Sequence, residues 1–156
     1  MPSLLWGRVP KLFAAVAILY GVLERRASPL DPVLRSLVTV RVSQINGCRF
    51  CVDINSATLA HRAGSRSKVD ALPAWRNSDL FDAKEAAALE YAESMTDSTQ
   101  RVTDAVFDRL RQVFDEDAII ELTGLIAFQN LSSKFNSALD VPAQGFCRLP
   151  ERPVQP

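Results

Sequence analysis

Two cysteines three residues apart, Cys48 and Cys51, are the side chains of this sequence best suited to chemistry. They directly follow Asn46-Gly47, a dipeptide that bends the chain, and a helical pattern then runs from Cys48 until Gly64 can end it. A spacing of three residues puts both thiols on one side of the first helical turn. The free N–H groups and the positive end of the helix dipole stabilise a thiolate there. The sequence therefore predicts a redox-reactive cysteine pair.

A Cys-x-x-Cys pair supports thiol–disulfide chemistry because a helical turn brings both sulfurs within bonding range. One thiolate attacks an oxidised substrate, and the other thiol resolves the product into a disulfide. With a peroxide, the attacking sulfur becomes a sulfenic acid, with which the second thiol condenses. Two weaker interpretations are a pair of inert buried cysteines and a zinc site completed by His61 and Cys147, whose spacing fits none of the usual zinc patterns.

Three polar residues follow the pair on the same predicted helix. Asn55 comes four residues after Cys51, one turn along the same face, so its amide can orient a water or a peroxide oxygen, or simply bond to backbone. Asp53, near the helix start, most simply supports the helix N-terminus electrostatically. His61, the single histidine, comes ten residues after Cys51 and points to a different side, so we do not expect it to act as a base.

Composition and charge limit the class of protein. The 156 residues, 47% of them apolar, suit one domain with a core of its own. Lys plus Arg and Asp plus Glu both total 18, which favours self-association and gives no sign of a nucleic-acid surface. Three cysteines, two of them close together, are typical of cytosolic redox or metal chemistry, so we expect a cytoplasmic protein. No glycine-rich phosphate loop is present, and we expect no metal, flavin or nucleotide cofactor.

Helical periodicity and capping residues predict an all-α bundle of six to seven helices. Helix starts are expected at Pro10, after Asp31, at Cys48, after Thr103 and after Asp115. A short helical turn near residues 67–72 and a capping-box start at Asp82 with Glu85 complete the set. We divide the single domain of residues 1–156 into an N-terminal helical extension (1–30), a core (31–141) and an extended tail (142–156).

The first and last predicted helices are rich in apolar residues. Leu12–Leu23 is shorter than the roughly 20 residues that span a bilayer, and no small-residue cleavage site follows it. We expect a buried amphipathic helix there, with an interfacial membrane helix as the less favoured alternative. The final helix, from Glu116 to about Leu139, carries too many apolar residues for one narrow stripe. This predicts a long apolar helix buried on several sides, or on one side by a second subunit.

Residues 32–64, and especially the run RVSQINGCRFCVDINSA, resemble the carboxymuconolactone decarboxylase / alkylhydroperoxidase D-like family. The run AKEAAALEYAESMT resembles the family's second conserved helix, and FDEDAIIELTGLIAFQNLSSKFNSAL resembles its long C-terminal helix. The resemblance implies an all-α, AhpD-like fold and assembly into trimers, hexamers or related oligomers. In the peroxidase branch it implies that Cys51 becomes the sulfenic acid and that Cys48 is the proton donor and resolving thiol. The helix dipole alone would instead favour Cys48 as the more acidic thiol.

The sequence departs from the peroxidase pattern at three positions. The family has a glutamate twelve residues before the first cysteine, where this chain has Ser36. It has histidines just before and four residues after the second cysteine, where this chain has Phe50 and Asn55. Ser36 and Asn55 can form hydrogen bonds but cannot act as bases near neutral pH. Thiolate formation must then rest on the helix dipole and on Arg41 or Arg49.

The sequence thus predicts a thiol-dependent oxidoreductase that reduces hydroperoxides through a Cys48/Cys51 sulfenic acid–disulfide cycle. Its expected partners are a hydroperoxide, a dithiol reductant and further copies of the same chain. Two alternatives stay open: a carboxymuconolactone decarboxylase-type lyase, which the retained cysteine pair disfavours, and a non-enzymatic redox-sensing or structural oligomer. Cys147, in the predicted tail, has no assigned role.

Overall fold

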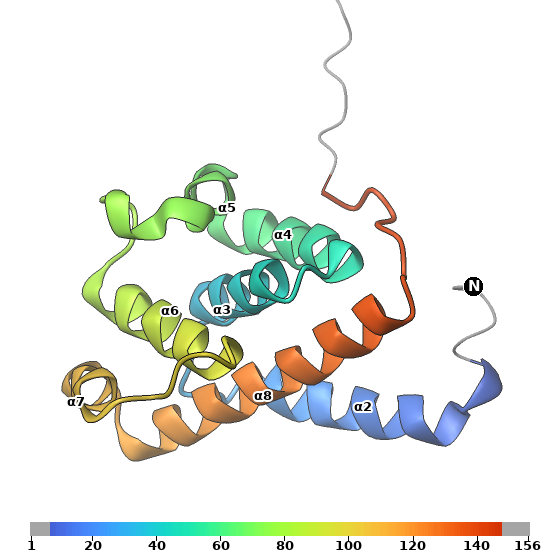
Figure 1. Ribbon diagram of the computed structural model, residues 1–156, viewed down its shortest axis with the longest axis horizontal. Coiled ribbons are helices and arrows are strands. Elements are labelled where there is room, and N and C mark those ends of the chain that lie inside the picture. Colours follow the sequence, from blue (N-terminus) through green and yellow to red (C-terminus); the bar gives the residue numbers. More distant parts are fainter. Residues whose placement is uncertain (1–6, 148–156) are drawn as a thin grey trace, which may run out of the picture.

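The computed structural model describes residues 7–147, in which every regular element is a helix and no β-strand occurs. The element order is α2 (Pro10–Leu23), α3 (Pro32–Ile45), α4 (Arg49–Ala63), α5 (Ser67–Ala71), the 3-10 helix η1 (Leu72–Asn77), α6 (Ala83–Thr96), α7 (Asp104–Val113) and α8 (Glu116–Ala138) (Figure 1). These seven α-helices confirm the predicted all-α class and the predicted number of helices.

Polar caps fix where several of these helices begin. The Asp31 carboxylate accepts hydrogen bonds from two backbone N–H groups at the start of α3. Asp82 and Glu85 form the predicted capping box of α6. Thr103 and Asp115 each accept one backbone N–H at the starts of α7 and α8. Such caps are worth about 1 kcal/mol each. The helix starts are therefore encoded locally in the sequence.

Helix α3 is the centre of the bundle, with α4, α6 and α8 packed around it (Figure 1). Its apolar side chains are buried in two directions. Leu37 and Val40 join the core cluster that includes residues of α4, α5, η1 and α6. Leu34, Val38 and Val42 join the larger cluster with α6, α7 and α8. A helix that is buried on several sides needs no single apolar stripe, and its β-branched residues are tolerated because tertiary packing outweighs their small helix cost.

Helix α2 is largely exposed, so the prediction of a buried amphipathic helix is wrong. It packs against α8 along one side (Figure 1), where Phe13 contacts Phe135 and Tyr20 contacts Phe128. Leu23 is its one buried residue. Phe13 and Val16 are partly buried. Five other large apolar side chains of α2 are between 45% and 70% exposed, namely Leu12, Ile18, Leu19, Tyr20 and Val22. Helix α2 is apolar as expected, but the rest of a single chain covers only one side of it.

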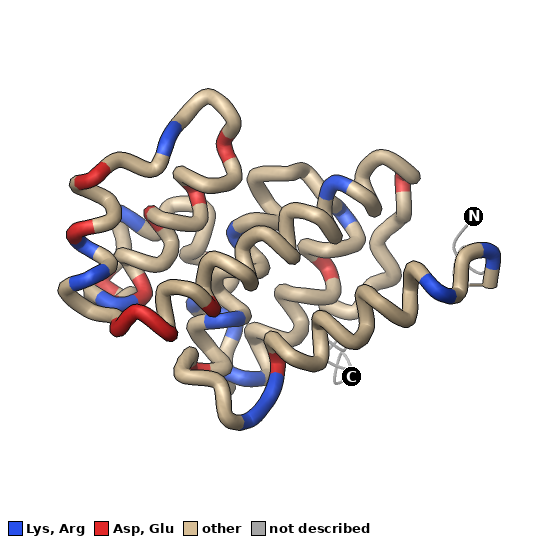
Figure 2. The backbone as a smooth tube through the Cα atoms, turned by 90° about the horizontal axis from the view of Figure 1, so that it is seen from below, with Lys and Arg blue, Asp and Glu red and all other residues tan. Residues whose placement is uncertain are grey.

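Charged residues hardly interrupt α2: within its bounds the only one is Lys11. The helix nearest the N-terminus is accordingly almost entirely tan in Figure 2.

Helix α8 is the longest of the described helices, but its expected apolar character is not supported. It buries Gln129 and Ser133 together with its apolar residues, and it carries further polar and charged side chains along its length. Within residues 7–147, no helix has both the length and the hydrophobicity needed to cross a bilayer.

The chain passes from α3 to α4 through a tight turn at Gly47, which has a φ of +63°. The N–H of Gly47 bonds to the carbonyl of Gln44, and the N–H of Cys48 bonds to the carbonyl of Ser43, both at 3.1 Å. These two bonds around a left-handed residue form a Schellman motif. Cys48 is also the N-cap of α4, so one residue closes α3 and opens the next helix.

We expect Gly47→Ala to lower the free energy of unfolding by about 1–2 kcal/mol, because a side chain disfavours the left-handed conformation by about that amount. Nothing lies within 4 Å of a Cβ added at Gly47, so the loss would come from backbone strain alone. Urea unfolding followed by circular dichroism measures it. Gly21→Ala, inside α2 and equally uncrowded, is the matched control and should be neutral or stabilising. Equal effects of the two substitutions would contradict this account of the turn.

Candidate active site

Cys48 and Cys51 form a disulfide at the start of α4. Their Cα atoms are 5.2 Å apart, inside the usual range for a disulfide. Cys48 is the N-cap and Cys51 is the third residue of the helix. The two residues are only 1% and 2% exposed. The structure thus joins the two thiols that the sequence singled out and shields them from solvent in this chain.

Each sulfur accepts one hydrogen bond. The backbone N–H of Cys51 donates to Cys48 Sγ at 3.1 Å. The side-chain amide of Asn136, on α8, donates to Cys51 Sγ with an N–S distance of 3.5 Å. A donor beside sulfur stabilises the thiolate that forms when the disulfide is reduced. The helix start alone would favour Cys48, and Asn136 gives Cys51 a donor that the sequence did not reveal.

Asn55 lies one turn after Cys51, and its amide joins a polar cluster between helices. Asn55 Nδ2 donates to Ser43 Oγ at 3.1 Å, and Gln129 Nε2 donates to the same oxygen at 3.0 Å. Gln129 Nε2 also donates to Ser133 Oγ at 3.0 Å. Ser43, Gln129 and Ser133 are buried. Because the Ser43 carbonyl also accepts the Cys48 N–H, this cluster ties α3, α4 and α8 together next to the disulfide.

Ser36 is buried in α3, where its hydroxyl donates to the Pro32 carbonyl and accepts a hydrogen bond from Arg62 at 2.9 Å. Arg62 comes eleven residues after Cys51 on α4, roughly 16 Å further along the helix axis. Arg62 also forms an ion pair with Glu24 at 2.6 Å. The position that carries the family's glutamate is therefore part of a structural contact between α3, α4 and the end of α2.

Arg41 is paired with a carboxylate on α6. Its guanidinium contacts Glu93 at 2.7 Å, and Trp75 and Arg76 contact the same carboxylate. Burial raises the pKa of Glu93, but the hydrogen bonds from Trp75, Arg76 and Arg41 outweigh it and hold that pKa below its ordinary value. Arg41 is therefore held by a carboxylate on α6, which it shares with Arg76, and no hydrogen bond joins it to either sulfur in the described residues. Arg49, the other cationic candidate, forms an exposed ion pair with Asp140.

Asp53 binds the C-terminal tail, a role that the sequence did not suggest. Its Oδ2 accepts the backbone N–H groups of Gln144, Gly145 and Phe146 at 2.8, 2.7 and 3.1 Å, and its Oδ1 accepts that of Cys147 at 2.9 Å. Gly145, with a φ of +81°, lets successive N–H groups converge on one anion. Burial raises the pKa of Asp53, but these four bonds outweigh it and hold the pKa below its ordinary value.

We call residues 144–147, held in this way, the tail clamp. Two more contacts fix it. The ring of Phe146 packs edge-to-face against Phe50, with centroids 6.5 Å apart. Arg66 donates to the carbonyl oxygen and to Sγ of Cys147, at 2.8 and 2.9 Å. The clamp therefore crosses the helix that carries the disulfide, while residues 148–156 of the predicted tail lie outside the described range.

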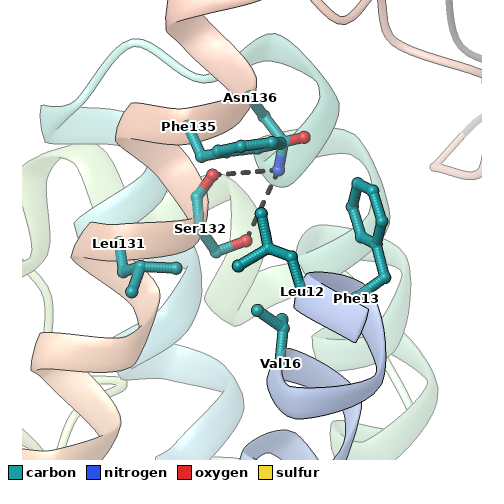
Figure 3. Close-up of a pocket in the computed structure, with 7 residues that line it drawn as sticks. All are labelled: Leu12, Phe13, Val16, Leu131, Ser132, Phe135 and Asn136. Carbon is teal, nitrogen blue, oxygen red and sulfur yellow. Dashed lines mark hydrogen bonds between the residues drawn. The ribbon is translucent and has the colours of Figure 1, made fainter. Parts of the chain in front are cut away.

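A small apolar cavity of about 70 Å³ lies between α2 and α8 (Figure 3). Helix α2 lines it with Leu12, Phe13 and Val16, and helix α8 lines it with Leu131, Ser132, Phe135 and Asn136. Asn136 is the same residue whose amide donates to Cys51 Sγ. The cavity therefore adjoins the disulfide through one shared side chain. Among residues 7–147, no group of three or more His, Cys, Asp or Glu residues could hold a metal ion.

Residues 10–94 match the carboxymuconolactone decarboxylase family, and the chain belongs to this family. The uncharacterized protein YnjA of Escherichia coli K12 is 52% identical over 147 residues, which cover 94% of this chain and 81% of YnjA. The uncharacterized protein YdfG of Bacillus subtilis 168 is 30% identical over 115 residues, covering 73% of this chain and 78% of YdfG.

Solved structures confirm the AhpD-like fold. ATU0492 of Agrobacterium tumefaciens, suggested to be the antioxidant defence protein AhpD, is 26% identical with a TM-score of 0.82, covering 88% of this chain and 94% of its own. The debrominase Bmp8 is 25% identical with a TM-score of 0.83, covering 91% of this chain and 76% of its own. The fold of this chain is therefore shared by proteins described by different activities.

We expect Asp53→Asn to release the tail clamp, because an amide offers only one acceptor oxygen and turns a donor group toward N–H groups. Hydrogen exchange of the amides of residues 144–147, corrected for intrinsic rates, should become at least tenfold faster. Asp140→Asn is the matched control: Asp140 is exposed, adjoins the tail and bonds to Arg49, so exchange at 144–147 should not change. Unchanged protection in Asp53→Asn would show that the clamp does not depend on this carboxylate.

The wild-type clamp should also depend on pH. The folded state lowers the pKa of Asp53, so the clamp contributes stability that is complete above the ordinary Asp pKa of about 4 and lost as pH falls through the lowered value. Amide chemical shifts of residues 144–147 should therefore titrate only below pH 4. A transition centred above that pH would contradict the assignment of Asp53 as the charge that holds the tail.

Proposed function

We propose that this chain is a thiol-dependent oxidoreductase of alkylhydroperoxidase type, which reduces hydroperoxides through the Cys48/Cys51 pair. The observation that carries the proposal is the disulfide at the start of α4, with a hydrogen-bond donor at each sulfur. Membership of the carboxymuconolactone decarboxylase family and the likeness to AhpD-type structures support an enzyme of this superfamily. Retention of both thiols argues against a lyase that does not use them.

The proposed cycle is balanced in atoms and electrons. The Cys51 thiolate attacks the terminal oxygen of a hydroperoxide, an S–O bond forms, the O–O bond breaks, and the alkoxide leaves with the proton of the Cys48 thiol. The Cys48 thiolate then attacks the Cys51 sulfur, and hydroxide leaves as water after taking a proton from solvent. The two sulfurs lose two electrons, and the hydroperoxide becomes an alcohol and water. A dithiol reductant reopens the disulfide by exchange.

In this proposal the amide of Asn136 takes over part of the task that the family gives to acid–base residues. It stabilises negative charge on Cys51 Sγ without itself titrating. Both sulfurs are nearly buried, so we propose a small dithiol reductant, or local opening beside the tail clamp when the reductant attacks. We place the cycle in the cytoplasm, where reduced dithiols are maintained.

The decisive test is peroxide consumption with a dithiol reductant, comparing the intact protein with Cys51→Ser, Cys48→Ser and Cys147→Ser. Either of the first two substitutions should lower the rate at least a hundredfold, and Cys147→Ser should retain it. In a single turnover, Cys48→Ser should gain one oxygen atom at Cys51 in the mass spectrum, because no resolving thiol remains. Cys51→Ser should gain none.

Two other outcomes would contradict a peroxidase activity. An intact protein that forms the Cys48–Cys51 disulfide with peroxide but never turns over would support a redox sensor in place of an enzyme. Thiols that do not react with peroxide at all would show that the family relationship describes the fold of this chain and not its chemistry.

A second candidate is reductive dehalogenation by the same dithiol, favoured by the likeness to the debrominase Bmp8. A carbon–halogen bond would be replaced by a carbon–hydrogen bond, halide and a proton would leave, and the two thiols would become the disulfide. Release of bromide from 2,3,4-tribromopyrrole, with a dithiol present and no peroxide, distinguishes this activity from the first.

We also propose that the chain works as a homo-oligomer, with a trimer or hexamer as the expected form. The exposed apolar side chains of α2, and Ile120 and Leu131 of α8, support a second copy as the surface that covers them. A formal net charge of zero offers little repulsion between copies.

If α2 is an interface, Ile18→Glu should shift the mass measured by light scattering after size exclusion to smaller species, because it buries a charge between subunits. Ile18 is 70% exposed in the single chain, so the monomer itself should tolerate the change. Leu80→Glu is the matched control, since Leu80 is an exposed apolar residue beyond η1, and it should leave the mass unchanged. A wild-type chain that is monomeric, or an Ile18→Glu oligomer of unchanged mass, would refute the proposed interface.

A further inference from the structure

The chain that follows α8 runs back past the start of α4 (Figure 1). It contacts α4 at Arg49, Phe50 and Asp53, through an ion pair, a ring contact and the four backbone hydrogen bonds of the tail clamp. Arg49 and Phe50 come four and three residues before Asp53, so all three side chains lie on one side of the helix. The tail clamp therefore covers one side of the helix start that carries the disulfide.

The disulfide lies on the other side of the same two turns. Cys51 comes two residues before Asp53, which is a rotation of about 200° around the helix axis. Its sulfur meets the Asn136 amide of α8. Gln144, the first residue of the tail clamp, comes only eight residues after Asn136. One continuous stretch of chain therefore holds the start of α4 from both sides.

A reductant needs access to one of the two sulfurs, because exchange begins when a thiolate attacks a disulfide sulfur. Both sulfurs are nearly buried, and the exposed side of α2 and α8 is the face that we propose for a second copy of the chain. Another approach is an open hollow of about 670 Å³ between α4 and the tail. Its walls include Gly47 and Arg49, which flank Cys48, and Ala143 and Cys147 of the tail. Cys48 itself does not line the hollow, so the first turn of α4 must move before a reductant there meets the sulfur.

The hold of the tail clamp depends mainly on one carboxylate. Asp53 accepts all four backbone N–H groups of residues 144–147, whereas the other contacts of the clamp are one ring pair and the hydrogen bonds from Arg66. Hydrogen bonds to a charged group are about twice as strong as neutral ones, so release from Asp53 frees these residues together. Phe146 is 54% exposed. Segments with few buried apolar contacts open locally while the core stays folded.

We propose that the tail clamp is a gate for reduction of the disulfide. When residues 144–147 leave Asp53, the first turn of α4 is free to move, and a dithiol reductant reaches Cys48 from the hollow. Asp53 is then a positioning residue, since it acts through the tail. The inference rests on the proposed function and adds a point of control to its reductive half.

The gated step is a thiol–disulfide exchange. One thiolate of the reductant attacks Cys48 Sγ, the S–S bond breaks, and Cys51 leaves as a thiolate that the Asn136 amide stabilises. The second thiol of the reductant loses its proton to solvent and attacks the reductant sulfur of the mixed disulfide, which releases the Cys48 thiolate. The dithiol gives up two electrons and becomes a disulfide, and the two protein sulfurs gain these electrons and take up protons from solvent.

Reduction kinetics test the gate. The disulfide is first formed with diamide, excess dithiothreitol is added, and the thiols of Cys48 and Cys51 are followed by alkylation and mass spectrometry. We expect Asp53→Asn to be reduced at least tenfold faster than the wild-type protein. Phe146→Ala removes the ring that packs against Phe50 without changing any charge, and it should be reduced at least twofold faster.

A wild-type rate in either variant would overturn the inference. In Asp53→Asn it would show that release of the tail does not govern access to the disulfide. In Phe146→Ala it would assign the effect of Asp53→Asn to the lost negative charge near the sulfurs and not to the tail.

Two control variants separate the gate from other effects. Asp140→Asn breaks the exposed ion pair with Arg49, which contributes little, so the rate should stay within twofold of the wild-type value. Thr103→Ala removes the cap of α7 and lowers the overall stability while leaving the tail clamp intact, so it should also keep the rate. An acceleration in either control equal to that of Asp53→Asn would show that the effect is not specific to the tail clamp and would overturn the gate.

The assay contains no peroxide, so the gate and the proposed function can fail separately. Faster reduction of Asp53→Asn and Phe146→Ala in a chain that does not consume peroxide would support the gate and overturn the proposed activity. Peroxide turnover together with a wild-type rate of reduction in Asp53→Asn would support the activity and overturn the gate.

Discussion

The turn at Gly47 is the constraint on which the site depends. Its left-handed conformation lets Cys48 close the Schellman motif of α3 and cap α4 with the same residue. Helix α3 is buried at the centre of the bundle, so packing on several sides holds its end in place. The tight turn then sets the position of the first turn of α4. The disulfide therefore follows directly on the central helix of the bundle, and its two sulfurs accept hydrogen bonds from a backbone N–H and from the C-terminal half of α8.

Buried polar contacts fix α8 against this point. Ser43, Gln129 and Ser133 are shielded from water, so each unmade hydrogen bond would cost about 1–3 kcal/mol. The bond from Gln129 to Ser43 joins α8 to α3, so it forms only at one height and one rotation of α8 relative to α3. Asn136 follows Gln129 by seven residues, two helical turns, so the same alignment carries its amide to Cys51. The packing of α8 and its buried hydrogen bonds therefore place the Asn136 amide beside Cys51, although nothing in the sequence around Asn136 indicates this contact.

The site stabilises charge without a titrating base. Where the family's peroxidase pattern has glutamate and histidine, this chain has Ser36 and Asn55, and both are engaged in contacts between helices. Arg41 is paired with Glu93, which also binds Arg76. What remains at the sulfurs is the start of a helix and one amide, which favour a thiolate by fixed dipoles. A shared fold hosts different chemistries through such changes of side chains, and the likeness to both an AhpD-type protein and a debrominase is in keeping with this.

The sequence by itself determined the all-α class, the helix starts and the pairing of Cys48 with Cys51, because caps at Asp31, Asp82 and Asp115 and the spacing of the cysteines are local signals. The sequence could not determine that α2 stays exposed in the single chain. An apolar pattern shows that a helix face favours burial, but it does not show which other surface buries it. Two contacts were decided only by the tertiary structure. Asn136 meets Cys51 across 85 residues, and Asp53 binds a tail more than 90 residues away. Such contacts follow from how distant helices pack, and polar residues on a surface or in a tail carry no mark of the partner that packing will bring to them.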